Sequence, residues 1–261
     1  MNVYIMTDME GVSGIVRREQ VAPGSAAWRD ALRFAEADFN AAVAGAFAGG
    51  ARRVVLCDAH GGGNNIRIEN MDGRAEYERP TGRGSVMPAL FSGKFDVALL
   101  IGAHAMAGTQ GAFLEHTQSS ASWHNHTVDG KRWGELAQFA AWLGHFDVPL
   151  ALVTGDEAVC REAREFLGEV ETVAVKTALC RQYARSLPLE AAHKAISEAA
   201  ARAVLAAGKV RPFKPKLPAE VRLEFHSAEG ADGLARRPGV RRIDGRTVGW
   251  TASTALQLIG I

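Results

Sequence analysis

Short apolar runs alternate with longer helical patterns over the first 175 residues, and this alternation most constrains the fold. The apolar runs predict buried strands, at residues 2–6, 53–57, 95–102, 149–154 and 172–175. The helical patterns predict helices, at residues 25–48, 134–143, 157–167 and 189–207. Strands that alternate with helices usually run parallel, because each crossover returns the chain to the same edge of the sheet. The sequence therefore predicts an α/β fold of three layers, with a mostly parallel sheet flanked by helices.

The composition changes after residue 210, where Pro212, Pro215 and Pro218 mark a connection. The remaining chain predicts a smaller α+β portion, with strands at 221–225 and near 240 and 248 and a helix at 228–236. We therefore expect a catalytic core at residues 1–210 and an extension at 211–261, packed on the core or at subunit interfaces. Residues 66–92 are rich in glycine and proline and predict loop with strand fragments.

Polar side chains that can bind ligands follow three of the predicted strands. Asp8 and Glu10 follow the first strand, and His60 and His104 follow the next two. Ligands of open α/β sheets bind at the carboxyl ends of the strands, so this recurrence points to one site. Each residue alone has a plain structural explanation, such as an acidic turn or a hydrogen-bonded histidine. The joint occurrence at strand ends makes those explanations less attractive.

Together with residues farther along the chain, these side chains form a candidate metal site. The candidates are Asp8, Glu10, Asp58, His60, His104, His116 and Glu135. Carboxylates combined with imidazoles suit zinc, manganese or cobalt better than magnesium or calcium. A carboxylate such as Asp8 can bridge two metal ions in a hydrolase that activates water. Glu135 is expected at the start of a helix, where a first-turn acid is also common for purely structural reasons.

Other classes of function fit the sequence less well. The net charge of +1 indicates neither nucleic acid nor a membrane surface as a partner. The three cysteines show no CxxC spacing, and no signal peptide or membrane span is predicted, so we expect a cytoplasmic protein. No GxSxG, GxGxxG, P-loop or HExxH motif is present. For the His124-x-His126 pair, a structural or substrate-contact role is favoured over metal binding, and His145 and His193 are expected at the surface.

The motifs taken together resemble the M55 family of D-aminopeptidases, over roughly residues 1–210. The resemblance is carried by Asp8-Met9-Glu10-Gly11-Val12-Ser13-Gly14, Asp58-Ala59-His60, Gly102-Ala103-His104-Ala105, Glu115-His116-Thr117 and Gly134-Glu135-Leu136. It implies an enzyme that removes amino-terminal D-residues, such as D-alanine, from short peptides or amides by metal-activated water. It also implies a ring-like homo-oligomer, for which a decamer is one possible size.

The resemblance further implies two zinc ions per subunit and a role for each matching residue. The implied ligands are Asp8, Glu10, His60, His104 and Glu135, with Asp8 between the ions. His116 matches the catalytic histidine, for which we favour a general acid/base or oxyanion-stabilising role. Asp58 is expected to orient His60 through its other ring nitrogen.

The sequence departs from the family pattern in the loop that leads to His116, and two rival functions are also compatible with the candidate residues. The loop from His104 to His116 is one residue longer than in the type member, and Met106 replaces a common arginine, so substrate preference is open. One rival is a di-metal amidase or esterase acting on other small substrates. The other rival is a peptide-binding module for peptide uptake, which would not need the whole set of metal-site residues.

Overall fold

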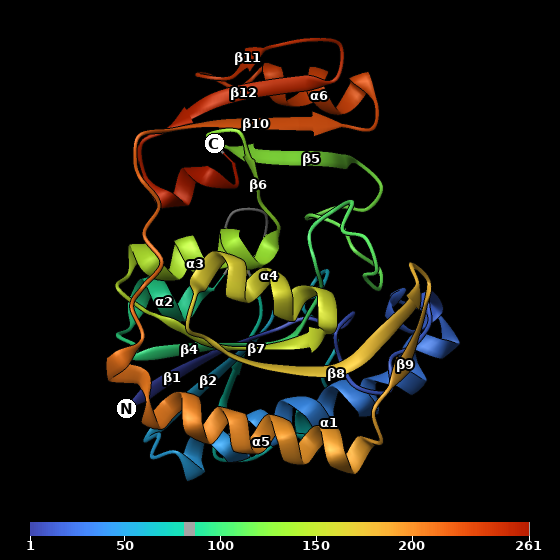
Figure 1. The fold of residues 1–261 in the computed structure, drawn as a ribbon, viewed down its shortest axis with the longest axis vertical. Helices are drawn as coiled ribbons and strands as arrows, with labels where there is room; N and C mark the ends of the chain where they lie inside the picture. Colours follow the sequence, from blue (N-terminus) through green and yellow to red (C-terminus); the bar gives the residue numbers. More distant parts are fainter. Residues whose placement is uncertain (81–86, 261) are drawn as a thin grey trace.

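The large sheet is built from the apolar runs of the sequence. A computed structural model describes residues 1–80 and 87–260. Its seven-stranded sheet has the order β3-β2-β1-β4-β7-β8-β9 (Figure 1). The strands are β1 (Asn2–Thr7), β2 (Arg53–Asp58), β3 (Glu76–Glu78), β4 (Val97–Ala103), β7 (Leu150–Asp156), β8 (Glu171–Cys180) and β9 (Tyr183–Ser186). All neighbours pair in parallel except β8 and β9, so the predicted mostly parallel sheet is confirmed.

Helices cover both faces of this sheet, as predicted (Figure 1). One face packs against α1 (Ala26–Ala48) and α5 (Leu189–Leu205). The other face packs against α2 (Pro88–Ser92), α3 (Glu135–His145) and α4 (Glu157–Leu167). Side chains cap two of these helices at their amino ends, because Ser25 Oγ accepts a hydrogen bond from Trp28 N at 2.9 Å and the Asp156 carboxylate accepts one from Val159 N. The predicted α/β class is therefore confirmed.

A second, antiparallel sheet lies beyond α3 and α4 (Figure 1). Its strands, in order, are β11 (Arg241–Arg242), β12 (Thr247–Ala252), β10 (Ala219–Phe225), β5 (Trp123–Val128) and β6 (Lys131–Arg132). The hairpin at 123–132 thus joins the strands of the expected 211–261 extension, and α6 (Ala228–Ala235) packs beside them. Asp129 and Gly130 turn the hairpin with φ of 49° and 79°, values that fit a tight hairpin turn.

Helix α3 lies between the two sheets and is apolar on two sides. Leu136 and Ala140 belong to the core under the large sheet, whereas Ala137 and Ala141 belong to the core under the small sheet. A helix buried on two sides is held from both, so its first turn is firmly placed. Glu135 is the first residue of that turn.

The segment predicted as irregular contains three short elements among its described residues. These are η2 (Ile68–Asn70), β3 and α2, whereas residues 81–86, with the glycines at 82 and 84, lie outside the described residues. Other single-turn helices are η1 (Arg18–Val21), η3 (Ala207–Lys209) and η4 (Ala255–Leu258). Over residues 1–80 and 87–260, no helix combines the length and the hydropathy needed to cross a bilayer.

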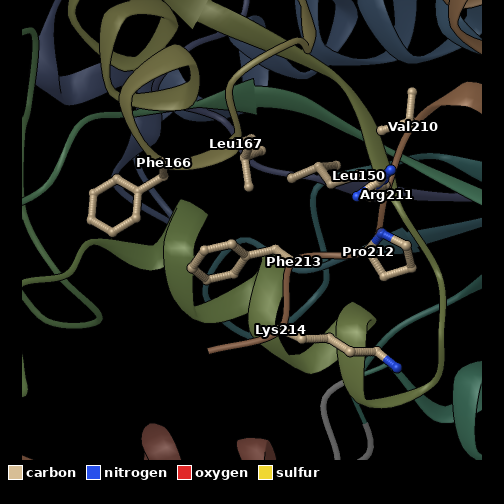
Figure 2. Close-up of a pocket in the computed structure, with 8 residues that line it drawn as sticks. All are labelled: Leu150, Phe166, Leu167, Val210, Arg211, Pro212, Phe213 and Lys214. Atoms are coloured by element: carbon tan, nitrogen blue, oxygen red, sulfur yellow. The ribbon is translucent and has the colours of Figure 1, made fainter. Parts of the chain in front are cut away.

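The connection between α5 and the small sheet crosses a shallow pocket beside α3 and α4 (Figure 2). The pocket is lined by Leu150, Phe166, Leu167, Val210, Arg211, Pro212, Phe213 and Lys214. It contains no histidine or acidic side chain, so its chemistry is not that of the candidate metal site. Here Phe213 packs so close to Gly144 that its carbonyl oxygen would lie 2.0 Å from a Cβ at that glycine.

Candidate metal centre

The first two carboxylates of the site come from the loop that follows β1. Because β1 pairs in parallel with β2 and with β4, the carboxyl ends of these three strands are neighbours. Asp8 N donates to Ile101 O at 2.8 Å, and Gly11 N donates to Gly102 O at 2.8 Å. A Cβ at Gly11 would lie 2.0 Å from Ala103 O, and one at Gly102 would lie 2.1 Å from Asp8 O. Glycine is therefore required at both positions for the two loops to meet.

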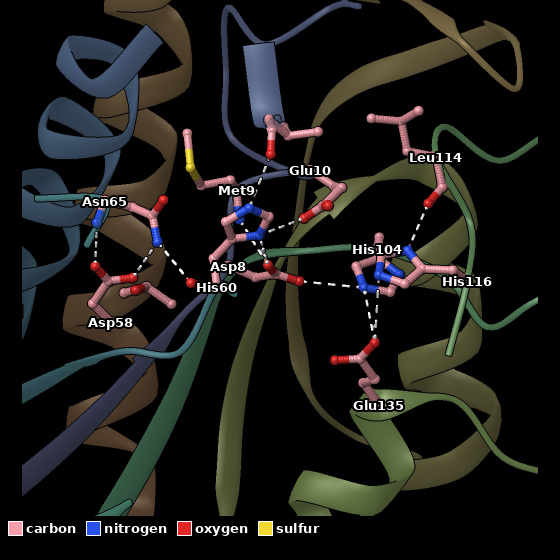
Figure 3. A network of polar contacts seen from close by, with 12 residues as sticks. Asp8, Met9, Glu10, Asp58, His60, Asn65, His104, Leu114, His116 and Glu135 are labelled. Carbon is pink, nitrogen blue, oxygen red and sulfur yellow. Dashed lines mark hydrogen bonds and ion pairs between the residues drawn. The ribbon is translucent and has the colours of Figure 1, made fainter. Parts of the chain in front are cut away.

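His60 lies directly against both carboxylates (Figure 3). Its Nδ1 is 2.9 Å from Asp8 Oδ1 and 3.2 Å from Glu10 Oε2. Its other ring nitrogen, Nε2, lies 3.2 Å from Val21 O. The expectation that Asp58 contacts this second nitrogen is therefore wrong.

Asp58 instead fixes the turn that follows β2. Its carboxylate accepts hydrogen bonds from Asn65 N at 2.6 Å and from Asn65 Nδ2 at 2.9 Å. Asn65 Nδ2 also donates to His60 O at 2.7 Å. Asp58 therefore positions the backbone of His60 through Asn65, at the sharp glycine-rich turn, rather than the imidazole ring.

His104, His116 and Glu135 form the other half of the cluster (Figure 3). His104 Nε2 lies 3.3 Å from Asp8 Oδ2 and 3.3 Å from Glu135 Oε1. The His116 ring stacks on His104 with 3.9 Å between centroids, and His116 Nε2 lies 3.7 Å from Glu135 Oε1. Gln118 N donates to Glu135 Oε1 at 2.6 Å and holds that carboxylate in place.

The structure thus brings together six of the seven candidates, all except Asp58. Two overlapping groups each place their ligand atoms within 4.8 Å of one another. One group is Asp8, Glu10 and His104, and the other is His104, His116 and Glu135. His60 touches the first group through Asp8 and Glu10.

The electrostatics of the cluster are those of closely opposed carboxylates and imidazoles. Burial and the charge of Glu10 raise the pKa of Asp8 above its ordinary value. Burial also acts to raise the pKa of Glu10, but the charge of His60 outweighs it and the pKa falls well below the ordinary value. Burial acts to lower the pKa values of His60 and His104, but the facing carboxylates, chiefly Glu10 and Glu135, raise both well above the ordinary value. The site is thus organised around opposite charges.

The donor atoms fit a transition-metal cation such as zinc. Glu10 Oε2 is buried and accepts no hydrogen bond among the described residues, although it lies close to His60. A buried carboxylate oxygen without a hydrogen bond is costly unless a cation compensates it. Imidazole nitrogen together with carboxylate oxygen is a donor set that zinc accepts.

Two buried charged residues support the site, and the sequence interpretation missed both. Lys176 in β8 is fully buried, and its Nζ donates to Glu10 O at 2.7 Å and to Ile15 O at 2.5 Å. Glu162 in α4 accepts from Met106 N at 2.8 Å, and burial raises its pKa to about 7. The lysine directly follows the apolar run at residues 172–175 and lies inside β8, so its place within a strand could have marked it. The glutamate carries no comparable signal, because helices commonly expose glutamate.

The remaining histidines lie away from the cluster. His126 is buried in the small sheet, with Nε2 2.9 Å from Leu258 O and Nδ1 3.2 Å from Gln138 Nε2, so the structural role favoured for it is confirmed. His124 is exposed next to His226, and His145 is exposed as predicted. His193 is only partly exposed, because its Nε2 lies 3.3 Å from the buried Asp38 carboxylate, so the surface expectation for it is wrong in part.

A buried cluster of carboxylates and imidazoles at the carboxyl edge of a parallel sheet is the make-up of a metallohydrolase. The model of the M55 peptidase family, described as D-aminopeptidase, matches residues 1–261. The chain therefore belongs to the M55 family of D-aminopeptidases, and the expected enzyme class is confirmed. Membership in this family favours neither of the two rival functions. One rival was a di-metal amidase or esterase, and the other was a peptide-binding module.

A curated relative and a solved structure, both from Bacillus subtilis, agree with this assignment. A D-aminopeptidase of strain 168 is 28% identical over 247 residues, which cover 95% of this chain and 89% of the relative. A solved structure, described as the Zn-dependent D-aminopeptidase DppA, a self-compartmentalizing protease, superposes with a TM-score of 0.89 at 27% identity. That match covers 99% of this chain and 94% of the solved chain. The fold, including the small sheet, is therefore shared over nearly its full length.

Proposed function

We propose that the chain is a zinc aminopeptidase that removes amino-terminal D-residues from short peptides or amides, with two zinc ions per chain. Asp8, Glu10 and His60 would hold one ion, and Asp8, His104 and Glu135 would hold the other. The observation that carries this assignment is the arrangement of Asp8, whose Oδ1 faces His60 at 2.9 Å while Oδ2 faces His104 at 3.3 Å. One carboxylate that presents its two oxygens to different imidazoles is suited to a position between two ions.

Zinc, when bound, supplies a Lewis acid for the scissile carbonyl and lowers the pKa of a water molecule toward neutrality. The residues of the chain supply orientation and proton transfer. His116 Nδ1 lies 2.9 Å from Leu114 O, which can only accept, so Nδ1 carries the hydrogen and Nε2 is left as the exchanging atom. His116 Nε2 faces Glu135 across 3.7 Å, at the edge of the cluster. From there Nε2 can take a proton and return it to the departing amine, or stabilise the negative charge that forms on the carbonyl oxygen.

The assembly and the location of the enzyme are part of the same proposal. The solved relative is described as self-compartmentalizing, and we propose a ring-like homo-oligomer for this chain, with a decamer as the size to be tested. Leu179, Tyr183 and Leu187, on or next to the β8–β9 hairpin, are exposed apolar side chains that suit a subunit contact. The three free cysteines agree with a reducing compartment such as the cytoplasm.

Metal analysis combined with a substrate panel tests the proposal. The purified chain should contain about two zinc ions per subunit, and Glu10→Ala and Glu135→Ala should each lower that content, because each removes a proposed ligand. The Glu69→Ala variant, which changes an exposed acid outside the cluster, serves as the control. Paired D- and L-aminoacyl amides should show turnover of the D-forms. A metal-free, chelator-insensitive enzyme would refute the zinc site, and turnover of L-forms alone would refute the D-specificity.

A further inference from the structure

The turn between β8 and β9 contacts the loop that carries His116. Arg181 in that turn makes its contacts with two consecutive residues of the loop. Its backbone oxygen accepts from Leu114 N at 2.8 Å, and its Nη2 donates to Glu115 O at 3.1 Å. Its Nε also lies 2.6 Å from Glu115 Oε2. A hairpin more than 60 residues away in the sequence therefore fixes the segment immediately before His116.

Leu114 adopts a conformation that needs such external support. Its φ is 52°, in the left-handed region, which costs a branched residue about 1–2 kcal/mol. A conformation of this kind persists only where the surroundings hold it. The buried Leu114 side chain is one restraint, and the hydrogen bond from Leu114 N to Arg181 O is another.

The strained backbone of Leu114 determines how His116 is presented. Leu114 O receives the hydrogen of His116 Nδ1 at 2.9 Å, which fixes both the tautomer and the tilt of the ring. The backbone of His116 is held separately, because its N donates to Ala105 O at 3.3 Å. A small shift of Leu114 O would therefore turn the ring without displacing the chain.

We propose that Arg181 is a positioning residue, which acts through Glu115 and Leu114 to aim His116 Nε2 at the metal centre. This inference rests on the catalytic role of His116 proposed above. The side chains of Arg181 and Glu115 are 43% and 15% exposed, and Glu115 Oε2 is itself buried, with the guanidinium as the cation that faces it. Loss of Arg181 is therefore expected to lower stability as well as catalysis, and the comparison of kcat with KM together with the double variant separates the two effects.

The hairpin also supplies a matched control. Arg185 lies on β9 of the same hairpin, where its backbone pairs with β8, and its exposed side chain makes no hydrogen bond or ion pair with the described part of the chain. Arg185→Ala removes the same side chain from the same hairpin without touching the His116 loop. Arg181→Ala keeps the backbone hydrogen bond from Leu114 N, so a difference between the two alanine variants isolates the side-chain contacts of Arg181 with Glu115 from a general loss of charge.

The experiment measures kcat, KM and zinc content of the zinc-loaded enzyme with a D-aminoacyl amide. Arg181→Ala should lower kcat by about 10- to 100-fold with little change in KM or zinc content, since small misplacements of a catalytic group cost this much. Arg185→Ala should match the wild type. Arg181→Lys, which keeps a cation beside the Glu115 carboxylate but loses the planar guanidinium that also donates to Glu115 O, should fall between them and also covers the case in which the alanine variant folds poorly. His116→Ala should lose about 10²–10⁴-fold in kcat with its zinc retained.

A double variant shows whether Arg181 acts through His116. In the His116→Ala background, Arg181→Ala should cause no further loss, because the group that it positions is already gone. Additive losses, or a kcat for Arg181→Ala equal to that of Arg185→Ala, would overturn the positioning role while leaving His116 catalytic. Full activity of His116→Ala would overturn both this inference and the proposed role of His116.

Discussion

The carboxyl edge of the large sheet and the middle of the small sheet each bury a histidine almost completely. His104 is 3% exposed and His126 is 1% exposed, yet their electrostatics are opposite. At His104 burial is outweighed by Glu135 and the other facing carboxylates, and the pKa lies well above its ordinary value. At His126 the polar groups that face the ring are neutral, namely the Gln138 amide and the backbone carbonyls of Leu258 and Trp133, and burial lowers the pKa to about 4. Burial alone therefore does not distinguish a metal ligand from a structural histidine, whereas the facing groups do.

Replacing each of the two histidines with glutamine is the strongest test of this difference between them. His104→Gln should lower activity by more than about 100-fold with loss of zinc, since even the outer partners of metal ligands cost 10–100-fold. His126→Gln should keep activity within about threefold and keep its zinc, because it lies away from the cluster and glutamine can replace both of its hydrogen bonds. Zinc analysis and kcat/KM with a D-aminoacyl amide check both variants. Similar zinc loss in the two would refute the distinction.

The sequence predicts the edge of the large sheet much better than it predicts the small sheet. Strand ends are local features, so the parallel alternation was enough to place Asp8, His60 and His104 together. The pairing of β5 with β10 joins residues nearly 100 positions apart, and no local pattern encodes such a contact. The sequence accordingly predicts the strand at residues 221–225, which is β10, but it does not predict that this strand pairs with β5.

The supporting residues escaped prediction for the same physical reason. Lys176 and Glu162 act through hydrogen bonds to backbone atoms of distant loops, and a backbone acceptor or donor leaves no mark in the sequence. Asp58 was recognised as part of the site but was given the wrong contact. A carboxylate two residues before a histidine can reach either the ring or the turn, and only the position of Asn65 decides between them.

The two sheets also differ in how closely neighbouring backbone segments approach one of their glycines. Replacing one glycine of each sheet with alanine measures this difference. Gly102 has a φ of 79°, and a Cβ there would lie 2.1 Å from Asp8 O, an immovable backbone atom. A Cβ at Gly249 in β12 would lie 2.8 Å from Ile243 Cδ1, the end of an exposed side chain that can move, and 3.1 Å from Val221 O, a backbone contact about 1 Å longer than the one at Gly102. Gly102→Ala should therefore cost about 3 kcal/mol or more, from backbone strain and overpacking together.

Gly249→Ala provides the control and should change stability by less than about 1 kcal/mol. Urea unfolding followed by tryptophan fluorescence gives both values, and zinc content should fall in Gly102→Ala alone. Equal costs in the two variants would show that the close contact between the loops after β1 and β4 is not specially constrained.

The smallest expected effect concerns pH and belongs to the small sheet alone. The folded chain holds His126 neutral, with its pKa lowered from 6.5 to about 4, so between these values the unfolded chain binds more protons. This contribution to stability is present above pH 6.5 and is lost as the pH falls toward 4. One pKa unit corresponds to about 1.4 kcal/mol, so between pH 7 and pH 5 the wild type should lose about 2 kcal/mol more than His126→Gln, which cannot titrate there.

Urea unfolding of both proteins at the two pH values, with equal zinc loading, measures the difference. Parallel losses would mean that the carbonyl of Leu258 stabilises the charged imidazole in the folded chain, and the contrast with His104 would then rest on the carboxylates alone.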